Sequence, residues 1–596
     1  MSEGSPADEH RSLKTALAVA AAWAMIASAG EYVVHLVGWY GFGKPMYVGI
    51  DAIWAKPLVN LVLFLAAAVV LYRLPARFFV ACLAFAAVAA TLLPVRPGSP
   101  VAMIILSAGI GTQLGILFAS ARRQALTARA GQVLAAVFVL ATVVSLATRV
   151  TRERSSPAVA ADAGVPNVLL IILDTVRSAS LARFGGRAST PHLDSLAATG
   201  IVFDRAVATA PWTLPSHASV FTGLWPHEHG ADWRAPLDDR APTLAEVFAR
   251  RGYRTGGFVA NLVYTSREHG LDRGFQVYRD YPRSLGALAR SAALIQTITT
   301  SSVLRRLTGL HEVVGRKAGA DVNREFLGWE NRAEGRPWFA FLNYYDAHEP
   351  YLPRDPFAAR YSEGLPPRRL DHLRFWNVEG GITGWNAFSP GEVEAEQAAY
   401  EEAITGLDAD IGALLGDLRR RGVLDRTLVV LMSDHGELFG EHGAHSHGNN
   451  VFWRTLHVPL IVSWPGHVPE GQRVFDPVSL RDVAATILSL ALPGAASELP
   501  GTPLTSSDSA RPHSLPLSEL SPEEFTRNAR AMKNGALQSL AGAEWRYARA
   551  ANGTEEAYWI GAGTEDTLVT VPAIREAIID TARARLAAAK IPPPRD

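Results

Sequence analysis

The chain has 596 residues, enough for more than one domain, and its 57 Lys and Arg residues balance its 57 Asp and Glu residues. A formal net charge of zero excludes the strongly basic character typical of nucleic-acid-binding proteins, and we expect no nucleic-acid partner. The single cysteine, Cys82, excludes a disulfide within the chain and a cysteine-based metal site.

The first 150 residues are rich in Ala, Val and Leu and carry few charges. Their apolar segments approach the ~20 residues that cross a bilayer as a helix, and they lie at about 13–37, 57–73, 78–94, 101–120 and 131–149. We therefore predict an all-α membrane bundle of about five spans over residues 1–150.

The basic residues of this region indicate its orientation, because cytoplasmic loops carry an excess of Lys and Arg. With the N-terminus in the cytoplasm, the inner side carries Arg11, Lys14, Arg73, Arg77, Arg122, Arg123 and Arg129, and the outer loops carry Lys44, Lys56 and Arg96. An odd number of spans then places the rest of the chain outside, although Arg149, Arg152 and Arg154 count against this. Arg is far more frequent than Lys, as in GC-rich bacteria, so we expect a multi-pass protein of the bacterial inner (cytoplasmic) membrane.

Glu31 and His35 lie four residues apart, on one face of the first predicted span. Ionisable groups within a membrane are costly and often functional. Alternatively, the span tilts or ends early and both side chains reach the membrane interface. The sequence leaves both interpretations open.

A linker at 151–166 leads into a soluble part in which short apolar runs alternate with helical patterns. Strands are predicted at 167–173, 200–203, 254–259, 338–344, 427–432 and 458–463, and helices at 192–199, 216–222, 243–251 and 394–421. This alternation favours a doubly wound α/β core over residues 167–470. A smaller C-terminal subdomain, 471–596, ends in a helix at 572–589, and long insertions at 284–318 and 354–392 could shape a substrate pocket.

Four polar residues stand where this core would place a ligand. Asp174 follows the first strand, Asp434 and His435 end another strand, and Thr213 opens a helix just before Pro215. Ligands of open α/β sheets bind beyond the carboxyl ends of the strands, and a helix N-terminus favours anions such as a phosphate or sulfate ester. One imidazole with carboxylates favours Zn, Mn or Fe over Ca, which prefers oxygen ligands. The alternative is that these side chains only cap helices and strand ends.

At this point the chain resembles the sulfatase branch of the alkaline phosphatase superfamily. The resemblance covers about residues 166–470 and rests on six sequence blocks in the family's order, namely 167–177, 190–197, 212–230, 346–351, 433–437 and 447–460. It implies an alkaline-phosphatase-like catalytic domain that cleaves ester bonds.

Several positions depart from the formylglycine sulfatases. Those enzymes need Cys or Ser where this chain has Thr213, and Arg where it has His217, so the resemblance implies an enzyme without formylglycine. Thr175 replaces the usual second Asp of the first metal motif, and His435 replaces the usual Asn. This set instead resembles the lipoteichoic acid synthases and phosphoethanolamine transferases, which use a Thr nucleophile, one transition metal and about five membrane spans. Their first metal carboxylate is usually Glu, whereas this chain has Asp174.

The resemblance implies a role for each site residue. Thr213 would be the nucleophile, and one divalent metal ion, Mn or Zn rather than Ca, would be bound by Asp174, Thr213, Asp434 and His435. His447 would contact the transferring group or protonate the leaving oxygen, and His348 is a similar candidate. His217 would orient Thr213. For each histidine, a purely structural role remains the alternative.

The implied function is that of a membrane-anchored, metal-dependent hydrolase or transferase. It would act on phosphate, or sulfate, esters of envelope lipids or glycans, with an extracytoplasmic catalytic domain. Two alternatives remain: a sulfatase that works without formylglycine, and a non-catalytic relative that binds an anionic ligand.

Overall fold

The computed structural model divides the chain into two compact units, each described here by itself. The helical unit comprises Met1–Arg154 and Pro282–Leu310, and the α/β unit comprises Ser155–Tyr281 and His311–Asp596. The residues that the structure describes are 12–41, 49, 51–95, 99–154, 161, 164–233, 235–282, 284–301, 316–332, 335–368, 389–505, 513–522, 533–560 and 565–595.

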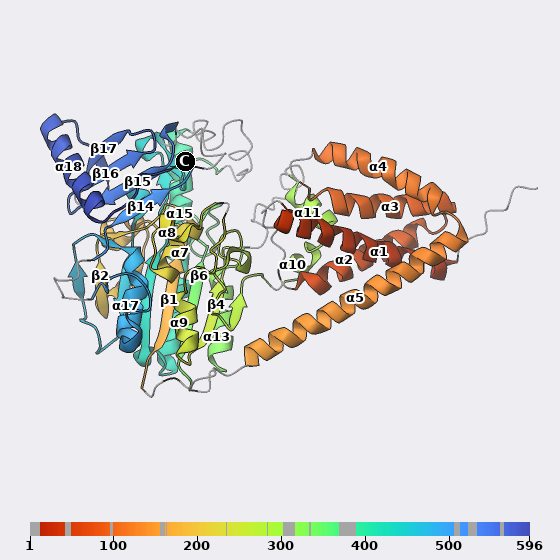
Figure 1. The fold of residues 1–596 in the computed structure, drawn as a ribbon, viewed down its shortest axis with the longest axis horizontal. Coiled ribbons are helices and arrows are strands. Elements are labelled where there is room, and N and C mark those ends of the chain that lie inside the picture. The colour runs from red at the N-terminus through yellow and green to blue at the C-terminus, as the bar shows by residue number, and fades with distance from the viewer. Residues whose placement is uncertain are drawn as a thin grey trace, which may run out of the picture. The chain divides into compact units, whose positions relative to one another are not determined.

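The helical unit confirms the predicted N-terminal helical region (Figure 1). Its main helices are α1 (Leu13–Leu36), α2 (Ala52–Leu71), α3 (Ala76–Leu92), α4 (Pro100–Leu117) and α5 (Ala121–Arg154). Within the described residues, four of these helices are long and apolar enough to cross a membrane. The exception is α3, which has 17 residues and falls short of the ~20 that a span needs. The prediction of about five spans therefore corresponds to four candidate spans and one shorter apolar helix.

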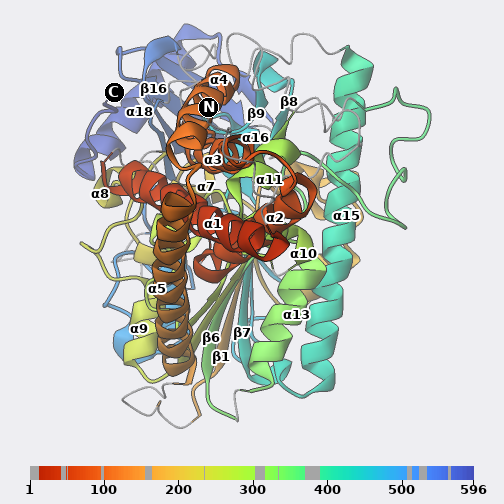
Figure 2. The same ribbon diagram turned by 90° about the vertical axis from the view of Figure 1, so that its right-hand side faces the viewer.

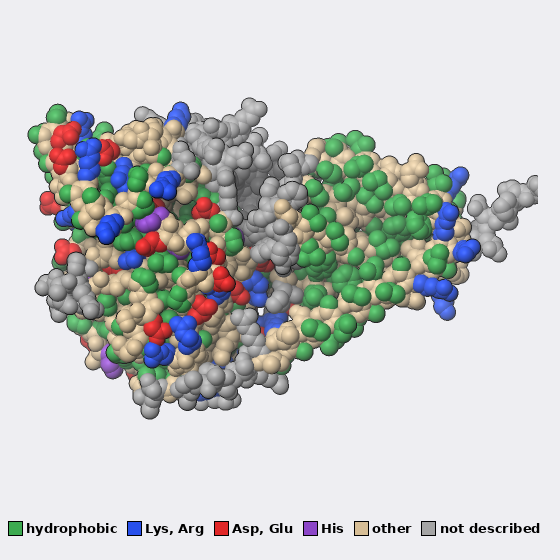
Figure 3. All heavy atoms as spheres, viewed as in Figure 1, with side chains coloured by type: hydrophobic (Ala, Val, Ile, Leu, Met, Phe, Trp, Pro, Cys, Tyr) green, Lys and Arg blue, Asp and Glu red, His purple; other side chains and the backbone are tan. Residues whose placement is uncertain are grey.

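The outer surface of this unit is largely apolar, with Lys and Arg side chains gathered at one end (Figure 3). Exposed Val and Leu side chains follow one another along α5, including Val133, Val137, Leu140 and Val144. A surface of this kind is stable in a lipid environment and costly in water. Of the basic residues used for the predicted orientation, Arg11, Lys44 and Arg96 lie outside the described residues.

A segment from the middle of the chain belongs to the helical unit. Helix α10 (Leu285–Ala289) contacts α2, helix α11 (Ala293–Thr300) contacts α3, and Leu294 packs against the apolar core of the bundle. The sequence had suggested that the insertion at 284–318 shapes a substrate pocket. Its described first part instead packs against the membrane-type helices, because its apolar side chains match theirs.

Glu31 lies inside this unit, with only 2% of its surface exposed. Its carboxylate lies 3.2 Å from the Lys56 ammonium, and it accepts hydrogen bonds from the Asn60 amide at 2.9 Å and from the backbone N–H of Ala293, at the start of α11, at 3.1 Å. Glu31 thus contacts both α2 and the inserted segment. Glu31 is therefore enclosed by protein groups and not exposed on the outer surface of its helix.

Replacing Glu31 with alanine is expected to destabilise the helical unit by about 3–5 kcal/mol, because the Lys56 charge would stay buried without its partner. Melting of the detergent-purified protein measures this effect. The double variant Glu31→Gln/Lys56→Met, which leaves no unpaired buried charge, should recover most of the loss. Equal melting temperatures for the wild type and Glu31→Ala would contradict the structural role of this cluster.

The α/β unit is built on an eight-stranded sheet with the order β12-β2-β11-β7-β1-β6-β4-β5. In that order the strands are Gln472–Val474, Gly200–Phe203, Leu460–Ser463, Thr427–Ser433, Asn167–Leu173, Trp338–Tyr344, Arg254–Val259 and Val277–Arg279. Strand β1 lies between β7 and β6 and is parallel to both, with Leu173 opposite Ser433 and Tyr344. The carboxyl ends of these three strands therefore meet at one edge.

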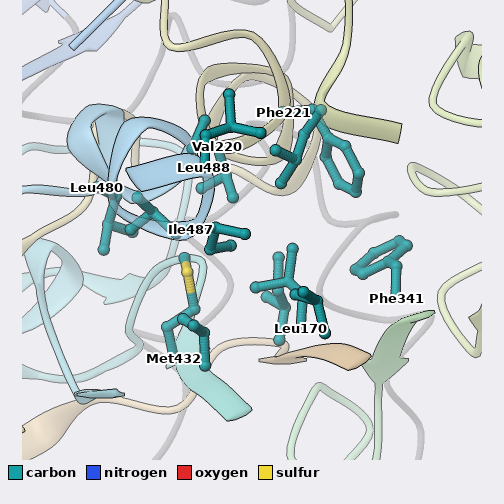
Figure 4. Packing of buried hydrophobic residues seen from close by; sticks show 14 of the residues in the cluster. Leu170, Val220, Phe221, Phe341, Met432, Leu480, Ile487 and Leu488 are labelled. Atoms are coloured by element: carbon teal, nitrogen blue, oxygen red, sulfur yellow. The ribbon is translucent and has the colours of Figure 1, made fainter. Parts of the chain in front are cut away.

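Side chains of β1 alternate between two apolar layers, which is why its sequence is a continuous run of apolar residues. Val168, Leu170 and Ile172 face the layer covered by α7 (Thr213–Thr222), α9 (Leu244–Arg250) and α17 (Val483–Ala491). Figure 4 shows Leu170 of this layer packed beneath Phe221 and Ile487.

The opposite residues of β1, Leu169, Ile171 and Leu173, face the second layer. It is covered by α6 (Pro191–Ala198), α13 (Gly319–Glu330) and α15 (Pro390–Arg420), the last two of which run along the sheet in Figure 2. Helices on both faces confirm the predicted doubly wound α/β class.

A smaller C-terminal part carries a five-stranded antiparallel sheet, β14 to β18, covered by α18 (Pro572–Ala588). Its strands are Leu517–Leu520, Leu537–Ala541, Trp545–Ala550, Glu555–Ile560 and Asp566–Leu568. Short elements complete the described unit: β3 (Ala206–Val207), α8 (Pro226–His229), β8 (Leu438–Phe439), β9 (His445–Ser446), α16 (Trp453–Leu456), β10 (His457–Val458) and β13 (Val478–Ser479).

Candidate functional site

The predicted metal ligands meet at the carboxyl edge of the main sheet. Asp174 follows β1, and Asp434 and His435 follow β7, the neighbouring parallel strand. Each of the three side chains offers a ligand atom, and these atoms all lie within 4.8 Å of one another. All three residues are fully buried. The sheet register thus brings together residues that are 260 positions apart in the sequence.

The electrostatics of this cluster fit a bound cation. Burial, and then the charge of Asp434, raise the pKa of Asp174 to about 8, and burial raises the pKa of Asp434 to about 7. Burial also lowers the pKa of His435 to about 4, which keeps its imidazole neutral and able to act as a ligand. Among the described residues, Oδ1 of Asp174 and Oδ2 of Asp434 find no hydrogen-bond partner. Two buried carboxylate oxygens without donors, beside a neutral imidazole, suit a divalent cation.

Thr213 is the first residue of α7, and only 1% of its surface is exposed. Its hydroxyl does not cap the helix. The N-cap residue is Trp212, while the Thr213 Oγ1 lies 3.3 Å from Nε2 of His435 and 3.5 Å from the amide nitrogen of Asn261. The hydroxyl therefore sits beside the metal-type cluster, at the positive end of a helix dipole.

Helix α7 is tied to the same cluster by two further side chains. The Ser216 hydroxyl donates to the backbone carbonyl of Asp434 at 2.7 Å. His217 donates from Nδ1 to the backbone carbonyl of Thr213 at 2.8 Å, and the same nitrogen lies 3.5 Å from Oδ2 of Asp434. Burial lowers the pKa of His217 to about 3. His217 thus holds the backbone of Thr213, and among the described residues it makes no hydrogen bond to the Thr213 hydroxyl.

His447 lies next to the cluster, and His348 lies next to His447. The ring centroids of His447 and His435 are 4.5 Å apart, and those of His447 and His348 are 4.9 Å apart. Trp212, beside Thr213, packs on His447 with its ring centroid 5.0 Å away. The structure therefore brings both predicted histidines to the site.

Two asparagines at the site were missed by the sequence analysis. Asn261, just after β4, donates to Oδ2 of Asp174 at 2.7 Å, and Asn343, on β6, lies 3.5 Å from the same oxygen. The Asn343 side-chain oxygen also accepts the backbone N–H of Asn261 at 2.9 Å. Both residues occupy the carboxyl-end region of predicted strands, and the rule that located Asp174 could have located them.

Thr175, which stands where the resembled enzymes have a second Asp, is in the left-handed region with φ of 62°. This conformation is unusual for a β-branched residue. It directs the Thr175 N–H to Oδ1 of Asp434 at 3.2 Å, while the hydroxyl donates to the carbonyls of Asp174 and Ala347. Thr175 thus joins the Asp174 loop to the loop that carries His348.

Two polar residues near these motifs in the sequence make contacts away from the cluster. Arg177, the last residue of the first sequence block, forms an ion pair with Glu441 at 2.8 Å. His442 contacts Asp566 of the C-terminal sheet at 2.7 Å.

Known proteins resemble this chain in sequence and in fold. The family model described as Sulfatase matches residues 166–493. The steryl-sulfatase of Rattus norvegicus is 26% identical over 391 residues, covering 55% of this chain and 67% of the relative. The arylsulfatase of Clostridium perfringens is 27% identical over 365 residues, covering 55% and 75% respectively. A multifunctional alkaline phosphatase superfamily protein of Trinickia caryophylli is 28% identical over 378 residues, covering 54% and 73%.

Among solved structures, the phosphonate monoester hydrolase of Agrobacterium radiobacter superposes with a TM-score of 0.54 at 22% identity. The match covers 71% of this chain and 95% of that protein. At this level of identity the likeness establishes the fold.

Proposed function

Because the chain belongs to the sulfatase family, we propose that it is a membrane-anchored, metal-dependent enzyme in which Thr213 is the nucleophile. Family membership makes it an ester hydrolase of the alkaline phosphatase superfamily. The observation that carries the proposal is the position of the Thr213 hydroxyl, at the start of α7 and 3.3 Å from Nε2 of His435. A buried hydroxyl at a helix N-terminus, next to a metal-type cluster, suits attack on an anionic ester.

Sulfatase-family enzymes bind a divalent metal ion. We assign the metal ligands to Asp174, Asp434, His435 and the Thr213 hydroxyl, because their donor atoms converge and two of the carboxylate oxygens accept no hydrogen bond from the described residues. The mixed nitrogen and oxygen donor set favours Mn or Zn over Ca. When bound, the ion would neutralise charge on the ester and lower the pKa of the Thr213 hydroxyl.

Each residue of the site then has its own role in the reaction. The Thr213 oxygen attacks the phosphorus in line with the leaving oxygen, so that a phosphothreonine forms and the bond to the leaving alcohol breaks. The proton that Thr213 releases reaches the leaving oxygen through a histidine, for which His348 and His447 are placed. His217 holds the backbone of Thr213. Water or an acceptor hydroxyl afterwards releases the phosphoryl group.

We favour phosphate over sulfate esters, because Thr213 cannot be converted to the formylglycine that the resembled sulfatases use. Sulfate-ester hydrolysis without formylglycine is the second candidate, and the names of the relatives support it, since they include a steryl-sulfatase and an arylsulfatase. The apolar helices suggest membrane association, and we propose the bacterial inner membrane, with the α/β unit outside and an envelope lipid or glycan as the carrier of the ester.

A substrate panel tests this proposal. The full-length protein, purified in detergent and loaded with Mn²⁺ or Zn²⁺, would be assayed on bis(4-nitrophenyl) phosphate, 4-nitrophenyl phosphate and 4-nitrophenyl sulfate. We expect turnover of a phosphate ester to exceed that of the sulfate ester by about 100-fold or more, equivalent to about 3 kcal/mol in the barrier. Faster sulfate turnover would support the second candidate, and a folded, metal-free and inactive protein would favour an anion-binding role.

A further inference from the structure

The loop 345–350 carries His348, and the side chain of Arg316 contacts this loop at several points. The two terminal nitrogens of the guanidinium donate to three backbone carbonyls, those of Tyr345 at 2.9 Å, Asp346 at 2.5 Å and Pro350 at 2.6 Å. The guanidinium also lies over the Tyr345 ring, 5.3 Å from its centroid. Because the guanidinium group is planar and rigid, these contacts fix the two ends of the loop relative to each other.

Other carbonyls of the same loop have donors of their own. The Ala347 carbonyl accepts the Thr175 hydroxyl at 3.1 Å, and the Glu349 carbonyl accepts Nδ1 of His348 at 2.8 Å. A carbonyl that is withdrawn from water needs a hydrogen-bond donor, and in a loop side chains supply many of these donors. Without Arg316, three carbonyls of the loop would need new donors, and the conformation of the loop would no longer be specified.

Tyr345 transmits this hold to His348. The Tyr345 carbonyl that accepts from Arg316 also accepts the backbone N–H of His348 at 3.2 Å. The rings of Tyr345 and His348 stack with their centroids 4.3 Å apart. His348 is half-buried, whereas His447 has only 3% of its surface exposed. Of the two histidines beside the site, His348 is therefore the more accessible to a substrate.

We infer that Arg316 is a positioning residue, whose guanidinium holds the loop 345–350 in the form that brings the His348 ring to the leaving oxygen of the ester. This inference rests on the proposed function, in which a histidine passes the proton of Thr213 to that oxygen. In this step the bond between phosphorus and the leaving oxygen breaks, the electron pair stays on the oxygen, and the His348 ring gives the oxygen the proton. Arg316 itself forms no bond and transfers no proton.

The inference predicts that the effect of replacing Arg316 depends on the leaving group. A phenolate is a poor leaving group that needs a proton, whereas 2,4-dinitrophenolate is stable and leaves without one. We expect Arg316→Ala to lower kcat on diphenyl phosphate about 100-fold, and on bis(2,4-dinitrophenyl) phosphate by less than about threefold, because a displaced catalytic group slows only the step that it assists. Loss of the fold, of the metal or of the nucleophile would slow both esters alike.

Steady-state kinetics of the full-length protein, in detergent and loaded with Mn²⁺ or Zn²⁺, measure this effect on both esters. His348→Ala should show the same dependence on the leaving group. Arg316→Ala/His348→Ala should be no slower on diphenyl phosphate than His348→Ala, because two residues that act through one step are not additive. Arg316→Lys has a compact ammonium in place of the rigid fork, and it should show the same pattern to a smaller extent. This variant also serves if Arg316→Ala does not fold.

Arg273 offers a matched control. It is a half-buried arginine that donates to the backbone carbonyl of Ala241 at 2.9 Å and lies 3.8 Å from the Glu246 carboxylate, so Arg273→Ala should leave the turnover of both esters unchanged. If Arg316→Ala and Arg316→Lys slow both esters equally, or slow neither, the inference is wrong even where Thr213 is the nucleophile. It is also wrong if the double variant shows the product of the two single losses. If Thr213→Ala hydrolyses both esters as fast as the wild type, the proposed function itself fails.

Discussion

Replacing Thr213 with alanine is expected to lower ester turnover by about 10³-fold or more, because the enzyme loses the oxygen that attacks the ester. The folded structure should survive the change. The hydroxyl makes long contacts to His435, at 3.3 Å, and to Asn261, at 3.5 Å, and does not cap α7. Losing such a buried hydrogen bond costs about 1 kcal/mol. Steady-state kinetics of the purified variant, alongside its melting temperature, measure both effects.

The control for this experiment is Thr213→Ser, which keeps the hydroxyl at the same helix position and removes only a methyl group. We expect Thr213→Ser to retain turnover within about tenfold of the wild type, since the loss of one methyl group changes local packing by about 1 kcal/mol. Thr213→Ala activity close to that of the wild type would show that another group, or water, attacks the ester, and would refute the nucleophile assignment.

Replacing Asp434 with asparagine is expected to abolish metal binding and to lower turnover by about 10³-fold or more, because a metal ion contributes several kcal/mol to charge stabilisation in the transition state. The change should not unfold the protein. Oδ1 of Asp434 accepts the backbone N–H groups of Thr175 at 3.2 Å and His435 at 2.8 Å, and an asparagine oxygen can accept both. The substitution also removes one of two neighbouring buried carboxylates, Asp174 and Asp434, which repel each other when ionised.

Melting temperature and metal content, measured on the wild type and on Asp434→Asn, distinguish a role of Asp434 in metal binding from a role in folding. After chelator treatment, Asp434→Asn should melt at the same temperature as the wild type or higher. On addition of Mn²⁺ or Zn²⁺, the wild type should gain stability, about 4 kcal/mol at a thousandfold excess over the Kd, whereas Asp434→Asn should gain little. Bound metal, measured by elemental analysis, should fall in parallel.

A matched control is Asp408→Asn. Asp408 is a buried aspartate that also accepts two backbone N–H groups, those of His192 and Leu193 at the start of α6. This variant should keep both the metal and the activity. If Asp434→Asn binds metal as tightly as the wild type, the ligand assignment must be abandoned.

The elements of the α/β core could be predicted because local patterns specify them. The apolar run 167–173 was expected to form a strand, and the structure has β1 at Asn167–Leu173. Helix α7 begins at Thr213, earlier than the helix predicted at 216–222, because Pro215 is compatible with a first turn and the turn starts before it. Apolar side chains buried on both faces of a strand leave a signal within a few residues, and no knowledge of the neighbouring strands is needed to detect it.

The positions of Asp174, Thr213, Asp434 and His435 could be predicted for a related reason. Each follows or begins a recognisable element, and parallel strands of an open sheet end at a common edge. The residues that support them were harder to find. Asn261 and Asn343 contact Asp174 only because β4 and β6 follow β1 in the sheet order, and that order is not readable from any single segment.

The sequence by itself determined that the chain has an apolar helical region and an α/β region. It also determined which polar residues stand at the ends of the strands. Only the tertiary structure decided that the described part of the insertion, 284–300, packs with the membrane-type helices, and that Arg316 holds the loop that carries His348. The physical reason lies in the range of the interactions. Burial patterns repeat over a few residues, whereas a buried polar group must find a partner wherever the folded chain supplies one, and that partner can lie far away in the sequence.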